Sequence, residues 1–356
     1  MLRLEDIVNA EIPSLTHGLE GKKIFVYGQG GLGKSKQLAK LPSPIHLACE
    51  NTDIYGIPQK QIRNWSDFQQ AIKLLCEEPT MKKCRETFKT IIVDGVDALS
   101  QMMINYICAT HLDGAQDLGD VDRKKIKVNG YKVCEKTAFD TLGLLLTSPY
   151  TVAFIGHGSV KVGEINKKKK SDEVDYPAGE KRVINLIVNN CPIVGYVLPL
   201  GEKGEGGKYL NSEINLFSDS DFFAKCRFPE VKPSFEFTLE NLNAELALGI
   251  EKEEKLNNVK SISFEDVEKQ KEKLKAKESF KETKDKIFKF LDVFEAKDTE
   301  ENKLISKAEI IRESVLGKGL KISELTERNM EAVDMILFKL TTLAEENNIS
   351  IDTATE

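Results

Sequence analysis

Short apolar runs alternate with amphipathic segments from residue 22 to about residue 237. Runs of four to six apolar residues bounded by turn residues are typical of buried strands, and their alternation with helical patterns predicts an α/β sheet. Between residues 49 and 90, the stretch SDFQQAIKLL has Phe68, Ala71, Ile72 and Leu75 at helical spacing, which predicts one amphipathic helix. The predicted strands are residues 24–27, 45–49, 90–93, 151–156 and 183–188.

A hairpin is expected after the fifth of these runs. Residues 193–200 and 209–217 are two apolar segments joined by the glycine-rich stretch GEKGEGG. A glycine-containing connection between two such runs predicts an antiparallel strand pair.

The pattern changes after about Leu248. Residues 249–286 are rich in Lys and Glu with few apolar positions, which indicates a solvated helix or linker. Beyond them, apolar residues return at helical spacing and predict three short helices that bury one small core. The members of the three stripes are Ile287, Phe290, Leu291 and Phe294; Leu304, Ala308, Ile311 and Val315; and Met330, Val333, Leu337 and Leu340. The chain is therefore divided into a core at 1–248, a charged segment at 249–286 and a helical domain at 287–356.

Composition limits the compartment and the general class of protein. The 356 residues carry a net charge of −6, so any nucleic-acid binding must depend on local basic patches. Seven scattered cysteines without a C-x-x-C pair are typical of reduced thiols, and no apolar run approaches the length of a membrane span. We expect a protein of the cytoplasm with no membrane partner.

A phosphate-binding loop follows the first predicted strand. The spacing of Gly28, Gly33, Lys34 and Ser35 fits G-x-x-x-x-G-K-[ST], in which glycines let backbone N–H groups surround an anion. The lysine reaches the β- and γ-phosphates, and the serine hydroxyl binds Mg²⁺. The expected nucleotide-binding residues are Gly28, Gln29, Gly30, Gly31, Leu32, Gly33, Lys34, Ser35 and Lys36, with ATP and Mg²⁺ as the cofactors.

Polar residues follow three further predicted strands. Asp94 ends the strand of FKTIIVDGVDAL, in the order after a phosphate loop that favours an Mg²⁺ carboxylate together with Ser35. Glu50 ends PIHLACEN, where a carboxylate beside phosphates can activate the attacking water, although a helix or turn cap is the alternative. His157 ends TVAFIGH, either as a sensor of the γ-phosphate or as an ordinary core histidine.

Two basic clusters lie in loops, and a third pair of cations lies near the end of the core. We expect both clusters to bind DNA, although they can also be ordinary solvated loops. The first cluster is Arg123, Lys124, Lys125 and Lys127, and the second is Lys167, Lys168, Lys169 and Lys170. Lys225 and Arg227 stand two apart, so on a strand they point to the same side. They can reach one phosphate group of a neighbouring subunit, or form only a surface ion pair.

Residues 4–248 resemble the phage-type AAA_24 ATP-binding proteins, which are RecA/Rad-like ATPases that include single-strand annealing recombinases. The resemblance is carried by GQGGLGKS, HLACEN, WSDFQQAIKLL, TIIVDGVDAL, AFIGH and AKCRFPEVKPSFEFT. It implies a RecA-like P-loop core with a mainly parallel sheet, with Lys34, Glu50, His157, Lys225 and Arg227 as the catalytic residues. His157 stands where true recombinases carry glutamine.

The resemblance also implies a function and partners. We expect a DNA-stimulated P-loop ATPase that binds ssDNA and promotes single-strand annealing or homologous recombination. Further copies of the chain and a single-stranded-DNA-binding protein are the expected protein partners. The alternative is an ATP switch that acts on a protein, such as a helicase loader or replisome adaptor. A small-molecule kinase is disfavoured because no arginine-rich lid is evident.

Overall fold

The structure is a computed structural model with two compact units, Ser14–Phe264 and Glu265–Glu356. It describes residues 16–51, 54–119, 128–162, 173–203, 209–257, 261–264, 266–267, 269, 280–326, 329–347 and 349.

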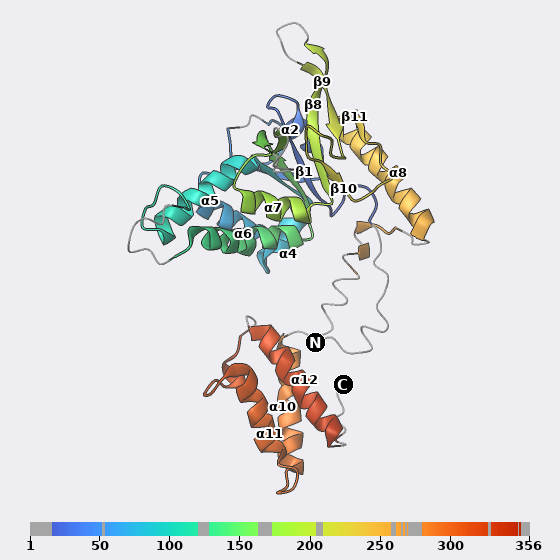
Figure 1. Ribbon diagram of the computed structural model, residues 1–356. Helices are drawn as coiled ribbons and strands as arrows, with labels where there is room; N and C mark the ends of the chain where they lie inside the picture. Colours follow the sequence, from blue (N-terminus) through green and yellow to red (C-terminus); the bar gives the residue numbers. More distant parts are fainter. Residues whose placement is uncertain are drawn as a thin grey trace, which may run out of the picture. The chain divides into compact units, whose positions relative to one another are not determined.

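The first unit is built on a nine-stranded sheet with the order β11-β9-β8-β1-β5-β4-β2-β3, in which β10 also pairs with β8 (Figure 1). The six strands from β8 to β3 pair in parallel, and β9, β10 and β11 add antiparallel pairs at one side. This order confirms the predicted α/β core with a mainly parallel sheet. The strands are β1 Lys23–Gly28, β2 Pro44–Ala48, β3 Gln59–Gln61, β4 Thr90–Asp94, β5 Thr151–Gly156, β8 Ile193–Lys203, β9 Tyr209–Asn215, β10 Lys225–Cys226 and β11 Ser234–Glu236.

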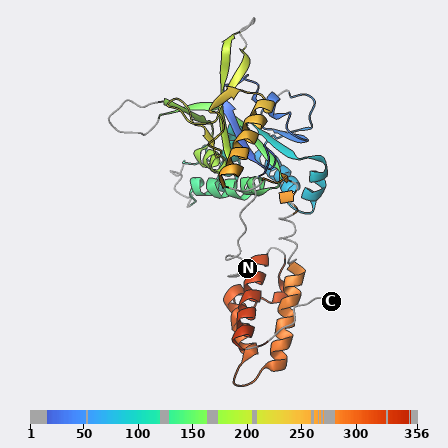
Figure 2. The same cartoon turned by 90° about the vertical axis from the view of Figure 1, so that its right-hand side faces the viewer.

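Helices cover both faces of the sheet (Figures 1 and 2). On β1, Phe25 and Tyr27 pack into one apolar core, whereas Ile24 and Val26 pack into the other, as the two-residue period of a strand requires. The first core includes α3 Trp65–Cys76, α4 Thr80–Thr87, α5 Val96–His111, α6 Gly130–Thr147 and α7 Lys181–Asn190. The second includes α2 Lys34–Leu38 and α8 Leu239–Asn257.

The expected strand at 183–188 is wrong, because this segment lies within helix α7. Its buried residues are Val183, Ile184, Ile187 and Val188, which recur at helical spacing on one face. A short apolar run has too few residues for its period to separate a strand from a buried helix. The hairpin predicted after it is confirmed as β8 and β9.

A second, two-stranded sheet projects from the end of β5. Its strands β6 Gly158–Val162 and β7 Glu173–Pro177 are antiparallel, and Ala178 N donates to His157 O at 2.9 Å where the hairpin closes. Asp175 ties β7 to the large sheet, because its Oδ2 accepts from Tyr196 Oη at 2.6 Å and its backbone oxygen accepts from Tyr27 Oη at 3.0 Å. The hairpin is thus tied near its base to β1 and β8 of the large sheet.

The second unit contains the three expected helices, α10 Phe280–Lys297, α11 Leu304–Leu316 and α12 Met330–Glu346, with the short 3₁₀ helix η1 Ile322–Glu324. Ile287, Phe294, Leu304, Val333 and Leu340 bury one apolar core, as the stripes predicted. The boundary expected at residue 248 falls inside α8, whose buried Leu246 and Ile250 continue the helix across it. The boundary at 287 falls inside α10.

The strand order determines which residues meet. Because β5 lies between β1 and β4, and β2 lies beyond β4, the carboxyl ends of these four parallel strands form one edge. The phosphate loop, His157, Asp94 and Glu50 follow those four ends. Among the described helices, none is both long enough and apolar enough to cross a membrane.

Candidate nucleotide-binding site

The phosphate loop connects β1 to α2. Gly28 has φ 139° and lies against the backbone carbonyl of Val197, so a side chain at this position would overlap the neighbouring strand. Gly31 and Gly33 have φ 80° and 78°, a conformation that residues other than glycine rarely adopt. The sequence motif therefore gives the local backbone geometry for which its glycines are required.

Lys34 is buried beneath this loop. Its Nζ donates to the carbonyl oxygens of Gly28 at 2.9 Å and Gln29 at 2.7 Å, and the residue is only 6% exposed. Burial lowers the pKa of Lys34, while Asp94, Asp97 and Glu50 act in the opposite direction. The loop thus holds the ammonium group in place before an anion arrives.

Ser35 and Asp94 meet as the motif predicts. Ser35 Oγ donates to Asp94 Oδ2 at 2.6 Å, and Asp94 is 4% exposed at the end of β4. A hydroxyl and a carboxylate are hard oxygen donors of the kind that Mg²⁺ takes, beside a loop shaped for phosphates. These two residues therefore fit the metal site expected of them.

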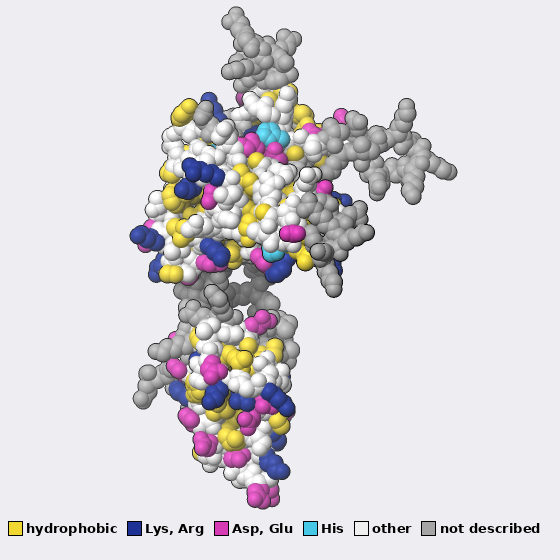
Figure 3. Space-filling view, turned by 90° about the vertical axis from the view of Figure 1, so that its left-hand side faces the viewer, with side chains coloured by type: hydrophobic (Ala, Val, Ile, Leu, Met, Phe, Trp, Pro, Cys, Tyr) yellow, Lys and Arg dark blue, Asp and Glu magenta, His cyan; other side chains and the backbone are white. Residues whose placement is uncertain are grey.

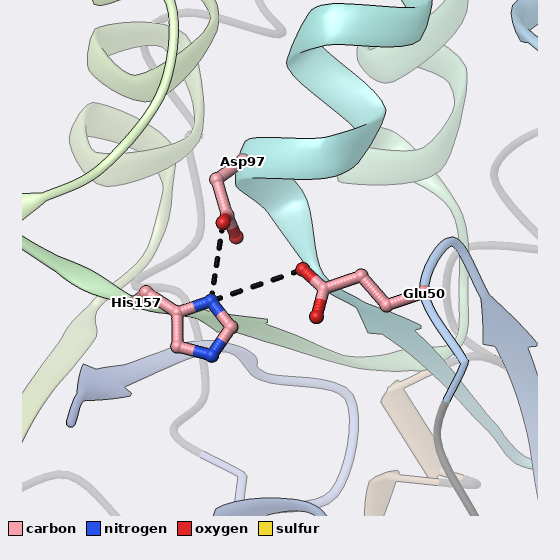
Figure 4. Close-up of side chains that lie close together, drawn as sticks. All are labelled: Glu50, Asp97 and His157. Carbon is pink, nitrogen blue, oxygen red and sulfur yellow. Dashed lines mark hydrogen bonds and ion pairs between the residues drawn. The ribbon is translucent and has the colours of Figure 1, made fainter. Parts of the chain in front are cut away.

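Three polar side chains lie together beside the loop: Glu50, Asp97 and His157 (Figure 4). His157 Nδ1 is 3.1 Å from Asp97 Oδ2 and 3.8 Å from Glu50 Oε1, and one atom from each of the three lies within 4.8 Å of the others. Asp97 comes from the first turn of α5, and Glu50 comes from the segment after β2. Gly95 leaves room for Glu50, because a Cβ there would overlap its carboxylate.

The electrostatics of this cluster affect Glu50 most clearly. Burial raises the pKa of the Glu50 carboxyl, and Asp97 raises it further, while His157 and Lys34 partly offset this effect. A carboxylate held above its usual pKa is a stronger base toward water than an exposed one.

His157 lies between the carboxylates and the phosphate loop. Its Nε2 is 3.8 Å from the point where a Cβ of Gly30 would lie, on the opposite side of the ring from Asp97. On the face of the core shown in Figure 3, an exposed histidine lies among acidic side chains. The ring of His157 can therefore contact the Asp97 carboxylate and the phosphate loop at the same time.

A cavity of about 790 Å³ opens over these residues, within the range of small-molecule sites. Loop residues 30–36 line it, with Glu50, Asp94 and His157. Ile54, Tyr55 and Ile57 form an additional wall that the sequence analysis missed, and Tyr55 is 86% exposed. An aromatic residue shortly after Glu50 was the available signal.

Two further residues of the site were also missed. Asp97 stands three residues after Asp94, one helical turn into α5, and the quoted motif DGVDAL contained it. His46 is completely buried in β2, with Nε2 3.3 Å from Asp94 Oδ2. A histidine inside an otherwise apolar strand was the signal for it.

Lys225 and Arg227 lie away from the loop of their own chain. Lys225 pairs with Val194 near the start of β8, whereas Gly28 pairs with Val197 further along the same strand. Lys225 Nζ donates to Val188 O at 2.7 Å, and Arg227 Nη2 donates to Asn189 O at 3.5 Å. Both cations thus cover the carboxyl end of α7, where positive charge is favourable, and their action on a neighbouring subunit stays a prediction.

The eight residues expected to bind DNA lie outside the described residues, as 120–127 and 163–172 are not described. The segments that lead to them are described. Residue 128 precedes α6, and the strands of the β6–β7 hairpin end at 162 and begin again at 173. The second basic cluster therefore belongs to the connection of that hairpin.

Comparison with known proteins agrees with this geometry. A curated relative, the SPbeta prophage-derived uncharacterized protein YorG of Bacillus subtilis (strain 168), is 31% identical over 348 residues, which are 96% of this chain and 99% of that protein. The crystal structure of the RadB recombinase gives a TM-score of 0.36 at 13% identity, over 62% of this chain and 88% of that one. The AAA_24 family model, described as an AAA domain, matches residues 20–228. The chain therefore belongs to the AAA_24 family and carries an AAA-type ATPase domain.

Proposed function

We propose that this chain is a phage-encoded, ATP-dependent ssDNA-binding protein that promotes single-strand annealing or homologous recombination. The ATPase domain supports the ATP dependence, and the prophage origin of the relative supports the source. Homo-oligomers on ssDNA and a single-stranded-DNA-binding protein as partner belong to the same proposal.

Each residue at the carboxyl edge has a role in ATP hydrolysis. Lys34 binds the β- and γ-phosphates of the substrate, and Glu50 accepts a proton from the attacking water. Ser35 and Asp94 would hold Mg²⁺, which when bound would supply charge neutralisation for the transferred phosphoryl group. Asp97 accepts a hydrogen bond from His157 Nδ1, because a carboxylate can only accept.

The nucleotide base is placed against the apolar wall. The ring of Tyr55, with Ile54 and Ile57 beside it, offers a face for stacking at one side of the cavity. Ring stacking on a base contributes about 1–3 kcal/mol.

The proposed dependence on DNA is supported by one observation: His157 belongs both to the nucleotide site and to the β6–β7 hairpin. Its side chain lies between Asp97 and Gly30 of the phosphate loop, and the next residue, Gly158, begins β6. Its backbone oxygen accepts from Ala178 N, which closes the hairpin. A ligand on the hairpin can therefore change the position of His157 relative to the γ-phosphate, and the four lysines of the connection give that ligand the character of a polyanion.

The second unit, which is helical, supports the adaptor as an alternative function. Helices α10, α11 and α12 bury a core of their own, and Ile310 is 66% exposed and Phe338 44% exposed on them. A unit of this kind can bind a protein, and an ATP switch would then act without DNA.

The ATPase rate with and without ssDNA tests the proposal. We expect ssDNA to raise the rate of the wild-type chain, and Lys34→Ala to have no activity in either condition because the γ-phosphate loses its main cation. A wild-type rate that is independent of ssDNA, with Lys34→Ala still inactive, would leave an ATPase and favour the adaptor. Full turnover by Lys34→Ala would remove the nucleotide assignment itself.

A further inference from the structure

The histidine of β2 has no role in the chemistry described so far. His46 is 0% exposed, and the Asp94 side chain beside it is 5% exposed. His46 Nε2 lies 3.3 Å from Asp94 Oδ2, and its backbone N donates to Pro58 O at 2.9 Å. The other ring nitrogen, Nδ1, is buried with no hydrogen-bond partner among the described residues.

This geometry decides where the proton of the ring lies. An ionised carboxylate only accepts hydrogen bonds, so the contact requires a proton on Nε2. The ring of His46 therefore carries a proton on Nε2 and donates it to Asp94 Oδ2.

Packing alone gives no reason for a histidine here. A buried polar atom without a partner destabilises the folded state, and an apolar ring would fill the same space without that cost. The only polar contact of the ring that the structure describes is with the oxygen of Asp94 that also accepts from Ser35 Oγ at 2.6 Å.

Two donors on one oxygen fix how the Asp94 carboxylate is turned. Ser35 is also the residue expected to bind Mg²⁺ through its hydroxyl, and a hydroxyl that turns toward a cation directs its lone pair there. His46, from the neighbouring strand, keeps its direction because the pairing of β2 with β4 fixes it. Partners behind metal-binding side chains commonly change metal affinity by about 10–100-fold when they are removed.

We propose that His46 is a positioning residue that orients Asp94 for the divalent cation that accompanies the nucleotide. The proposal rests on the Mg²⁺–ATP chemistry of the proposed function. His46 touches neither nucleotide nor metal and acts through Asp94.

The test measures metal binding directly. Mn²⁺ is titrated by electron paramagnetic resonance into the full chain saturated with ATPγS. We expect His46→Phe, which keeps a ring without a donor, to bind Mn²⁺ about 10-fold more weakly. His46→Gln places an amide N–H near the position of Nε2 and should lie within about 3-fold of the wild type. Binding of ATPγS in EDTA should be the same in all three proteins.

Thr90→Val is the matched control. It removes one buried hydrogen bond, from Thr90 Oγ1 to Pro42 O at 2.8 Å, at the other end of β4 from Asp94. Its Mn²⁺ affinity should be that of the wild type. If His46→Phe does not fold, His46→Leu removes the same donor with a smaller side chain.

Unchanged Mn²⁺ affinity in His46→Phe would overturn the proposal, and so would an equal loss in His46→Gln and Thr90→Val. A ¹⁵N spectrum of the wild-type imidazole with the proton on Nδ1 would overturn it independently. If the wild-type chain with ATPγS binds no Mn²⁺, the proposed function fails together with the metal role. Failure of the His46 proposal alone would leave wild-type Mn²⁺ binding intact.

Discussion

His157 Nδ1 lies 3.1 Å from Asp97 Oδ2, and this contact joins the end of β5 to the first turn of α5. Asp97 Oδ1 is buried and accepts no hydrogen bond among the described residues, so this oxygen can still accept one while Oδ2 contacts His157. Through this one contact, the orientation of the ring depends on a helix as well as on its own strand.

Asp97→Ala should lower kcat by about 10²-fold while nucleotide affinity stays the same. The ring loses the acceptor that orients it, and misplacement of a reacting group by about 1 Å has this scale of effect. Asp97→Asn retains an oxygen that accepts from Nδ1 and should keep most of the activity. Asp140→Ala, at an exposed carboxylate paired only with Lys136 on α6, serves as the control. Equal rates for Asp97→Ala and the wild type would exclude a positioning role.

The sequence predicted those parts of the site that depend on local spacing. The phosphate loop, Asp94, Glu50 and His157 each follow an apolar run, and parallel strands bring such ends to one edge. Asp97 and His46 were missed because their roles depend on the distance between elements. Asp97 acts only because α5 starts beside β5, and His46 acts only because β2 pairs with β4.

The fold shows the same division between local and tertiary information. Strands β1, β2, β4 and β5 and helices α10, α11 and α12 follow from their periods. Residues 183–188 adopt a helix because Val183, Ile184 and Ile187 have a face to cover on the sheet, and a single short run does not contain that information.

Glu50→Gln should bind ATP and hydrolyse it about 10²-fold more slowly, because the amide accepts no proton from water.

The same change should raise the melting temperature at neutral pH. Burial and Asp97 raise the pKa of Glu50 in the folded chain, so the folded state binds this proton more tightly than the unfolded state does. Stability therefore falls as the pH rises from the unfolded pKa to the folded pKa, and glutamine removes that loss.

Calorimetry between pH 4 and pH 8 measures the effect on stability, and steady-state kinetics measure the effect on the rate. Glu331→Gln is the control, because Glu331 is exposed and forms no ion pair with another described residue, whereas Glu245 pairs with Lys232. A Glu50→Gln variant with the wild-type rate would require another group to activate the water.

Tyr55→Ala should weaken nucleotide binding by about 10-fold, since stacking on a base contributes about 1–3 kcal/mol. Saturating ATP should restore kcat, because the residue lies on the wall of the cavity and takes no part in the hydrolysis step. Tyr55→Phe keeps the ring and should bind as the wild type does, and Phe139→Ala tests an exposed ring on α6. Titration of a fluorescent ATP analogue provides the measurement. Unaltered affinity in Tyr55→Ala would place the base elsewhere.

Arg227→Ala should reduce ATPase activity while nucleotide binding by each chain is retained, if this guanidinium acts on the site of a neighbouring subunit. A mixture of Arg227→Ala and Glu50→Gln chains should then recover part of the activity, because some interfaces contain an intact pair. Lys225→Ala also removes the 2.7 Å hydrogen bond to Val188 O, so it should in addition lose about 1 kcal/mol of stability. No recovery in the mixture, from a chain that stays monomeric on ssDNA, would contradict action between subunits.

Neutralising Lys167, Lys168, Lys169 and Lys170 to glutamine should weaken ssDNA binding on every sequence. Phosphate contacts are independent of base identity, and each one contributes about −0.7 to the slope of log affinity against log salt on single strands. Loss of four contacts should therefore flatten the slope by up to about 3 units. Basal ATPase activity should survive, because the four lysines are not part of the phosphate loop, but stimulation by ssDNA should fall. Fluorescence anisotropy of a labelled oligonucleotide with ATP, across a salt series, gives both affinity and slope.

A second variant with four glutamines separates a local effect from one of net charge. Lys73 on α3, Lys82 and Lys83 on α4, and Lys89 before β4 are exposed side chains, and their replacement changes the net charge by the same amount. This control should bind ssDNA with the wild-type slope. If the two variants behave alike, the general charge of the protein accounts for the binding. If both bind as the wild type does, the β6–β7 connection makes no phosphate contacts, and the helical unit with a protein partner becomes the better explanation for what the ATPase serves.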